Sequence, residues 1–371
     1  MKKAISILMA FTMAAAMLTG CGTGNAKSTA DTKAGETQTV EAGTTENAQT
    51  EKGSQSEKES QSGTNTPAAK TDGSYSLKVG SLKGPTSMGL VELMDKSQKG
   101  TANGSYEFTM VTAADELLGK VVSGELDVAL VPANMASILY TKTNHGITVL
   151  DINTLGVLYG ISGDDSIKSA VDLKGKTVYL TGKGTTPDYA LQHVLKANGL
   201  TTDDVTLEYK SEAAEVASIL KEKPEAVGLL PQPFVTAALA QNDSLKMVLD
   251  LTKEWDAKAG ADGGSLVTGV TICRNEVLKE QKEAIDTFMA EHKTSAEYVN
   301  ANVSEAAALV VSAGIIEKAP VAEKAIPYCS ITYVDGENMK SLLSGYLKVL
   351  FDMEPSSVGG TLPDDSFYYM P

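Results

Sequence analysis

The sequence is poor in arginine, tryptophan, histidine and cysteine: Arg274 is the only arginine, and there are one tryptophan, three histidines and three cysteines. Nucleic-acid-binding proteins favour arginine-rich basic grooves, so this composition and the formal charge of −15 argue against that class. One tryptophan provides no aromatic cluster for stacking on sugars. Cys273 and Cys329 are isolated, which argues against a structural zinc site. They could pair in an oxidising compartment or remain as two buried thiols.

The first 74 residues differ from the rest in composition. Two lysines precede an apolar run at residues 5–17, which is too short to span a membrane and indicates an export signal. Leu18-Thr19-Gly20-Cys21 resembles a lipobox, and this implies that Cys21 is lipidated and anchors the protein on the extracytoplasmic face of the cell membrane. An ordinary signal peptide and an uncleaved anchor are the alternatives. Residues 22–74 contain one branched aliphatic residue, so we predict a disordered tether.

A strand, a glycine-rich loop and a helix are predicted within residues 177–195. Val178-Tyr179-Leu180 forms the strand, and the loop runs from Gly182 to Thr186. Thr186 is predicted to be the N-cap, and Pro187 the first helical residue, because its missing N–H would be unpaired there anyway. Such a loop directs free N–H groups and the positive end of the helix dipole towards a small polar or anionic group.

The same pattern occurs 99 residues earlier. Residues 78–94 match 177–193, and the strand at 106–110 matches the strand at 205–209. The apolar runs that end in Pro132 and Pro231, with the helices after them, keep the same offset. A constant offset over strands, helices and loops predicts two similar α/β lobes.

Each repeat has the order βαβαβ, which predicts a mainly parallel sheet flanked by helices. We expect the run 155–161 to leave the first lobe, with a hinge at 160–165, and 266–273 to return as a strand. Residues after Glu276 have a helical pattern, followed by a tail pinned by its aromatic residues. The predicted organisation is residues 1–21 signal peptide, 22–74 tether, 75–161 first lobe, 162–266 second lobe, and 267–371 return to the first lobe with C-terminal helices. Two crossover segments would act as the hinge.

With its lipobox, polar tether and two lobes, the chain resembles the solute-binding lipoproteins of bacterial ABC importers. Within that group it is most similar to the nitrate/sulfonate/taurine and thiamine-pyrimidine branch, called NMT1/THI5-like. The segments that carry the resemblance are 78–94, 124–129, 172–178, 269–278, 284–288 and 298–302. The resemblance implies a two-lobed periplasmic-binding-protein fold without cofactor or metal. It also implies a monomer that captures a small polar or anionic organic molecule between its lobes and delivers it to an ABC permease and ATPase complex.

The positions that match the cleft of this family follow the ends of the predicted strands. They are Ser81, Lys83, Pro85, Thr86, Ser87, Asn134, Gly184, Thr185, Thr186 and Gln232. The hydroxyl residues are equally good helix caps, and Lys83 is equally typical of a solvated surface. Asn134 and Gln232 are the better candidates for hydrogen bonds to a ligand. Because Arg274 lies in the return segment, an anion would be held by N–H groups and hydroxyls rather than by an arginine fork.

Two other functions remain open. One is an enzyme on the same fold, similar to the chorismate dehydratases of the menaquinone pathway. None of His145, His193 and His292 neighbours a convincing nucleophile or carboxylate pair in the sequence, which argues against it. The other is a ligand sensor or a surface adhesin. The sequence leaves the identity of the ligand open.

Overall fold

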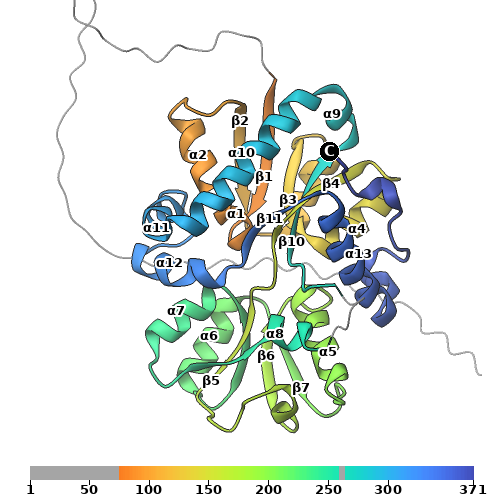
Figure 1. Cartoon of the computed structure of the whole chain (residues 1–371). Coiled ribbons are helices and arrows are strands. Elements are labelled where there is room, and N and C mark those ends of the chain that lie inside the picture. The colour runs from red at the N-terminus through yellow and green to blue at the C-terminus, as the bar shows by residue number, and fades with distance from the viewer. Residues whose placement is uncertain (1–74, 259–263) are drawn as a thin grey trace, which may run out of the picture. The chain divides into compact units, whose positions relative to one another are not determined.

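The computed structural model describes residues 75–258 and 264–371. They form two β-sheets with helices around each (Figure 1). We call the six-stranded sheet and its helices the first lobe, and the five-stranded sheet and its helices the second lobe. This arrangement confirms the predicted two-lobed α/β fold. The predicted export signal and tether lie outside the described residues, as does part of the turn expected at 262–265.

The sheet of the first lobe has the strand order β11-β4-β10-β3-β1-β2. Its strands are β1 (Ser76–Leu82), β2 (Ser105–Val111), β3 (Val128–Pro132), β4 (Ile147–Thr154), β10 (Gly269–Arg274) and β11 (Ile331–Val334). β1 pairs in parallel with β2 and β3, whereas β10 runs antiparallel to β3 and β4. The returning strand β10 therefore lies between two strands of the N-terminal half, and the sheet is mixed rather than purely parallel.

Helices cover this sheet from both halves of the chain. They are α1 (Pro85–Met88), α2 (Val91–Gln98), α3 (Ala114–Val122), α4 (Ala133–Lys142), α9 (Asn275–Glu280), α10 (Lys282–Ala301), α11 (Val303–Ser312), α12 (Ala319–Ala325) and α13 (Gly336–Met353), with short 3-10 turns at Ile326–Tyr328, Pro355–Val358 and Asp365–Phe367. The expectation that everything after Glu276 is helical was wrong at β11. Ile331 of that strand is buried, and pairing with β4 stabilises four residues that are too few to show a period of two.

The sheet of the second lobe has the order β7-β6-β8-β5-β9. Its strands are β5 (Leu158–Ser162), β6 (Thr177–Thr181), β7 (Thr206–Lys210), β8 (Val227–Pro231) and β9 (Lys246–Asp250), and its helices are α5 (Thr186–Ala197), α6 (Ala213–Glu222), α7 (Phe234–Gln241) and α8 (Leu251–Asp256), with a 3-10 turn at Ala170–Leu173. β6 pairs in parallel with β7 and β8, and β5 runs antiparallel to β8 and β9. The layout is that of the first sheet without β11.

The predicted repeat is present in the strand register. The matching pairs are Val79–Phe108 and Val79–Val128 in the first sheet, and Val178–Leu207 and Val178–Val227 in the second. Each residue of the second set follows its counterpart by 99 positions. The two copies therefore repeat strand pairing as well as sequence pattern.

Two crossover segments join the lobes. The chain leaves the first sheet at residues 155–157, because β4 ends at Thr154 and β5 already pairs in the second sheet. The predicted lobe boundary after residue 161 and the predicted hinge at 160–165 were therefore placed a few residues too late. The run 155–161 is apolar throughout, so its sequence does not mark the change of sheet. The return strand begins at Gly269, later than the predicted Leu266.

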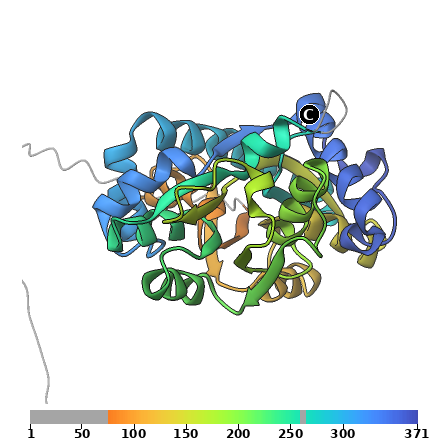
Figure 2. The same cartoon turned by 90° about the horizontal axis from the view of Figure 1, so that it is seen from below.

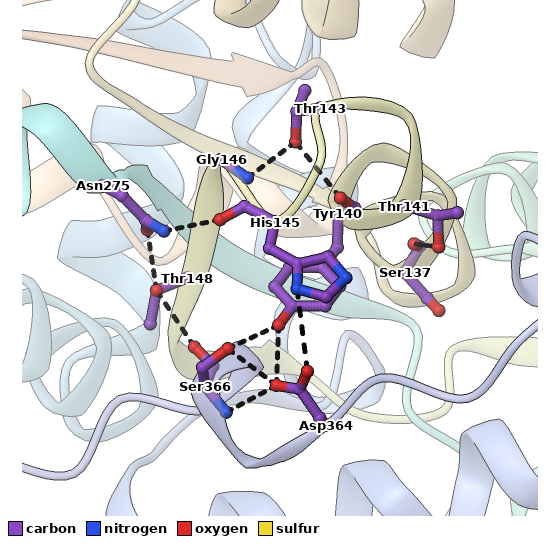
Figure 3. Close-up of polar contacts among 10 residues, drawn as sticks. All are labelled: Ser137, Tyr140, Thr141, Thr143, His145, Gly146, Thr148, Asn275, Asp364 and Ser366. Carbon is purple, nitrogen blue, oxygen red and sulfur yellow. Dashed lines mark hydrogen bonds and ion pairs between the residues drawn. The ribbon is translucent and has the colours of Figure 1, made fainter.

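The C-terminal tail is fixed to the first lobe, as predicted from its aromatic residues. Phe367 is fully buried, and the N–H of Tyr369 donates to the carbonyl of Val149 in β4. Figure 3 shows Asp364 accepting a hydrogen bond from the Tyr140 hydroxyl (2.8 Å). The ring of His145 stacks on that of Tyr140. Hydrogen bonds from Ser366 and Tyr140, with the nearby His145, lower the pKa of Asp364 to about 2.

Cys273 and Cys329 are both free and buried, so the disulfide alternative is not realised. Burial raises the pKa of both thiols to about 12. Among the described residues, we find no helix with the length and apolar character required to cross a membrane.

Candidate functional site

The candidate site lies at the boundary between the lobes, next to the crossovers. The N–H of Ala133, directly after β3, donates to the carbonyl of Thr268 (3.1 Å). The N–H of Gln232, directly after β8, donates to the carbonyl of Val157 (3.0 Å). Both loops are thus held against the crossover that arrives from the other lobe. The carboxyl ends of parallel strands are the usual place for a ligand in such sheets.

In the β1–α1 loop, three predicted site residues direct their hydroxyl groups into the loop itself. The hydroxyls of Ser81 and Ser87 are 2.7 Å apart, and both residues are buried. Thr86 donates to the carbonyl of Leu82 (3.0 Å), and Ser87 donates to the same carbonyl. These bonds are turn contacts within the loop rather than helix caps, because Gly84 is the N-cap residue of α1 and no side chain caps that helix. Of the remaining predictions, Lys83 is exposed and Pro85 is half-buried.

The β6–α5 loop differs from its prediction in two respects. Thr185, not Thr186, is the N-cap residue, and its hydroxyl donates to the carbonyl of Gly182 (2.6 Å). The N–H of Gly184 was expected to be free for a ligand but donates to the carboxylate of Asp188 (2.8 Å). An acidic residue in the first turn is favoured by the helix dipole, and here it occupies the position of an anionic ligand.

Asn134 and Thr186, one from each lobe, lie within reach of one another. The hydroxyl of Thr186 is 3.5 Å from Oδ1 of Asn134 and accepts a hydrogen bond from the hydroxyl of Tyr346 (3.2 Å). Nδ2 of Asn134 donates to the carbonyl of Ser357 (3.2 Å). Complete burial raises the pKa of Tyr346 well above its usual range, so its hydroxyl stays neutral. Sequence reasoning missed Tyr346, because it lies in α13, remote from the repeat.

Gln232 is 1% exposed and has one end of its carboxamide unpaired. Its Oε1 accepts hydrogen bonds from the N–H and the hydroxyl of Thr236 (3.2 and 2.8 Å). Its Nε2 has no hydrogen-bond partner among the described residues. The hydroxyl of Thr268, in the returning crossover, is buried and likewise unpaired within the described part of the chain. A buried donor without an acceptor costs about 1–3 kcal/mol, so these two groups are candidates for hydrogen bonds to a ligand.

A buried polar chain in the first lobe was also missed. Nδ1 of His292 lies 3.5 Å from Oδ2 of Asp151, and both side chains are fully buried. Thr271 donates to Asp151 (2.9 Å) and accepts from Asn153 (3.1 Å). A Cβ added to Gly269 would meet Asn153 and also Thr86 of the β1–α1 loop. The chain therefore extends from α10 to the lobe boundary. Its polar residues at the end of the apolar run of β4 were the available sequence signal.

Lys83 and Lys183, one from each glycine-containing loop, line two different cavities. Lys83 lines a cavity of about 460 Å³ together with Pro233 and Phe234 of the second lobe. Lys183 and Gly184 line another, of about 570 Å³, with Glu354 after α13. α7 contacts α12 on one flank and α5 contacts α13 on the other, as Figure 2 shows. The predicted site residues are thus distributed over both flanks of the boundary.

The sole arginine lies elsewhere. Arg274 pairs with Asp127 (3.2 Å) and Glu276 (3.3 Å) at the end of β10 remote from the crossover. The expectation that no arginine fork serves the cleft agrees with this position. Among residues 75–258 and 264–371, no group of three histidine, cysteine or acidic residues gathers as metal ligands.

A family model described as NMT1/THI5 like matches residues 123–306. Residues 123–306 belong to the NMT1/THI5-like family. The matched part includes the whole second lobe, both crossovers and the return into the first lobe. A comparison with curated proteins found no match.

Solved structures similar to this chain show its fold. An ABC transporter protein from Parabacteroides distasonis is 24% identical, with a TM-score of 0.68 over 79% of this chain and 98% of its own. The periplasmic aliphatic sulphonate binding protein SsuA from Escherichia coli is 15% identical, with a TM-score of 0.64 over 80% of this chain and 92% of its own. The ligand-binding component of an ABC-type import system from Staphylococcus aureus, solved with zinc bound, is 15% identical, with a TM-score of 0.61 over 79% and 96%. The fold is that of periplasmic binding proteins.

Proposed function

We propose that this chain is the extracytoplasmic solute-binding component of an ABC importer and captures a small polar or anionic organic molecule between its lobes. The observation that carries the proposal is the cavity of about 460 Å³ that Lys83 of one lobe and Phe234 of the other line together. Its volume is in the range of small-molecule sites. Two lobes joined by two short crossovers can close on a ligand by hinge rotation. The similar structures, an ABC transporter protein and the sulphonate binding protein SsuA, support the same function.

The proposal includes the partners and the location expected from the sequence. An ABC permease and ATPase complex would receive the solute from the closed form, and a lipid on Cys21 would hold the protein, as a monomer, at the extracytoplasmic face of the cell membrane. The site residues would be those of the loops at the lobe boundary, with Gln232 and Lys83 in direct contact with the solute and Ser81, Thr86 and Ser87 shaping the first loop.

The contacts of the histidines support binding rather than catalysis. His145 stacks on Tyr140 and pairs with Asp364 of the C-terminal tail (3.6 Å). His193 packs on the ring of Trp255, and His292 is buried beside Asp151. Each histidine thus contacts groups that hold the fold together. We therefore propose that the protein releases its solute unchanged.

Capture of a solute is tested by retention. The purified full-length protein is incubated with the small-molecule fraction of a bacterial extract, separated from free solutes, and unfolded, and the released compounds are identified by mass spectrometry. We expect one class of compound to be retained by the folded protein and lost from a heat-denatured control. Retention of no compound would contradict the proposed function, and conversion of the retained compound would favour an enzyme.

Closure is tested by distance. Val122 of the first lobe and Val171 of the second are exposed, whereas Cys273 and Cys329 are buried. In a Cys21→Ser background, cysteines introduced at both valines accept two dyes selectively. We expect the retained compound to change the efficiency of energy transfer between them. An unchanged efficiency would argue against closure.

A further inference from the structure

The pseudo-symmetry of the hinge is broken at two neighbouring pairs of positions. Pro132 pairs with Gly269 in the first lobe, and Pro231 pairs with Leu158 in the second, so Thr268 and Val157 occupy equivalent places. The residues after the two prolines are equivalent by the offset of 99: alanine at 133 and glutamine at 232. The first lobe thus has Ala133 next to Thr268, and the second lobe has Gln232 next to Val157.

The two polar members of this set are the ones without partners. Nε2 of Gln232 and the hydroxyl of Thr268 are buried and unpaired within the described residues. The backbone N–H of Gln232 donates to the carbonyl of Val157 in the first crossover, and that of Thr268 donates to the carbonyl of Thr154, the last residue before this crossover (both 3.0 Å). The two accepting carbonyls are three residues apart in the chain. Thr236 holds Oε1 of Gln232, which leaves the N–H bonds of Nε2 as the free groups.

A cavity lined by Pro233, the residue after Gln232, is mainly apolar. It is lined by Lys83, Pro233, Phe234, Ala237, Ala240, Gln241, Ile315, Ile316, Glu317, Lys318 and Val321. Phe234 is 41% exposed, which is unusual for a phenylalanine, and it lies directly beside the loop that carries the unpaired donor. Contact with an apolar part of a ligand would remove its ring from water.

Building on the proposed function, we propose that the solute is amphipathic. It carries a carboxylate or amide head group, which accepts hydrogen bonds from Nε2 of Gln232 and the hydroxyl of Thr268, and an apolar body, which lies against Phe234 and Ile315. A carboxamide donor suits a carboxylate or carbonyl oxygen. A cationic head group has no acceptor to offer and would leave both donors unpaired.

The test is a series of four probes with similar alkyl chains: hexanoate, hexanamide, pentane-1-sulfonate and hexylammonium. Binding to the purified full-length protein is measured by titration calorimetry and thermal shift. We expect hexanoate and hexanamide to bind and hexylammonium not to bind. We expect Gln232→Glu, which keeps the acceptor for Thr236 but replaces the free donor with a carboxylate, to weaken hexanoate binding about tenfold or more. Gln98→Glu makes the same change at an exposed residue of α2 that does not line this cavity, and it should change the affinity by less than about threefold.

Four results would overturn this inference. The first is equal binding of hexylammonium and hexanoate, and the second is unchanged hexanoate affinity in Gln232→Glu. The third is no binding of any probe to a protein that retains a solute in the extract experiment, which would refute the ligand class while the proposed function stands. The fourth is a lower melting temperature with unchanged affinity in both Gln232→Glu and Gln232→Met. In that case Nε2 of Gln232 would stabilise the fold through a resident water and would not contact the solute. Loss of both probe binding and solute retention by the wild type would instead refute the proposed function.

Discussion

Asp151 in the first lobe is fully buried beside His292 and Thr271, whereas its counterpart 99 residues later, Asp250, lies near the surface and caps helix α8. Both aspartates occupy the same place in the strand layout, next to the antiparallel strand. Only the first lobe is covered there by a helix from the C-terminal half, α10. The repeat thus sets the position of a side chain in the sheet, while the segments later in the chain determine whether it is buried.

A second pair differs in the same way. Ser137 in α4 and Thr236 in α7 are also 99 positions apart. The hydroxyl of Ser137 donates to the carbonyl of Val358 (2.7 Å), in the segment after α13. The hydroxyl of Thr236 donates to Gln232. In the second lobe, the equivalent hydroxyl therefore bonds within the candidate site and not to a later segment.

We expect the largest effect on stability at the two equivalent aspartates. Asp151→Ala leaves His292 and Thr271 buried without their partner, and we expect it to lower the free energy of unfolding by about 3–5 kcal/mol. Asp250→Ala removes a helix cap and should cost about 1 kcal/mol. Urea denaturation followed by circular dichroism measures both. Equal costs for the two variants would show that burial by α10 does not distinguish the lobes.

A smaller effect is expected at the equivalent hydroxyl groups of Ser137 and Thr236. Ser137→Ala removes one hydrogen bond and leaves the buried carbonyl of Val358 unpaired, so we expect a loss of about 1 kcal/mol in unfolding free energy with unchanged solute affinity. Thr236→Val frees Oε1 of Gln232 and should weaken binding of the retained solute several-fold. Affinity and denaturation are measured on both variants. Weaker binding in the Ser137 variant alone would reverse the assignment.

A pH effect is expected from the second lobe. Burial against Trp255 lowers the pKa of His193 below its usual value of about 6.5. Below about pH 6.5 the unfolded chain therefore binds more protons at this position than the folded chain, and stability falls as the pH falls. The melting temperature of His193→Gln should therefore change less between pH 7 and pH 5 than that of the wild type. The exposed His145, replaced by glutamine, is the control, and an equal flattening there would contradict the role of His193.

The smallest effect concerns the two thiols, which lie in the first lobe only. Burial raises the pKa of Cys273 and Cys329 to about 12, so both are protonated at neutral pH and shielded from reagents. In a Cys21→Ser background, we expect no reaction with a thiol reagent in buffer and two reacting thiols in urea. Reaction of either one in buffer at the rate of a free cysteine would show local opening of the first lobe.

Sequence patterns predicted the strands well because each is a short apolar run next to a turn. The offset of 99 is also kept in the strand pairing, since Val79 and Val178 have equivalent partners. The predictions failed where tertiary pairing decides: at β11, whose four residues depend on β4, and at the crossover 155–157, which lies inside a continuous apolar run. Of the candidate site, the loops were found, but the directions of their side chains were not.

Local sequence patterns were enough to predict two α/β repeats, their strands and the loops that border the crossovers, because apolar periodicity and turn residues act over a few neighbouring positions. Three features were seen only in the folded structure. Asp188 accepts a hydrogen bond from the N–H of Gly184, Tyr346 donates to Thr186, and Nε2 of Gln232 has no partner among the described residues. The contact of Tyr346 with Thr186 joins segments that meet only when the chain has folded. The other two depend on hydrogen-bond geometry within one loop and its helix, which a periodic sequence pattern does not encode.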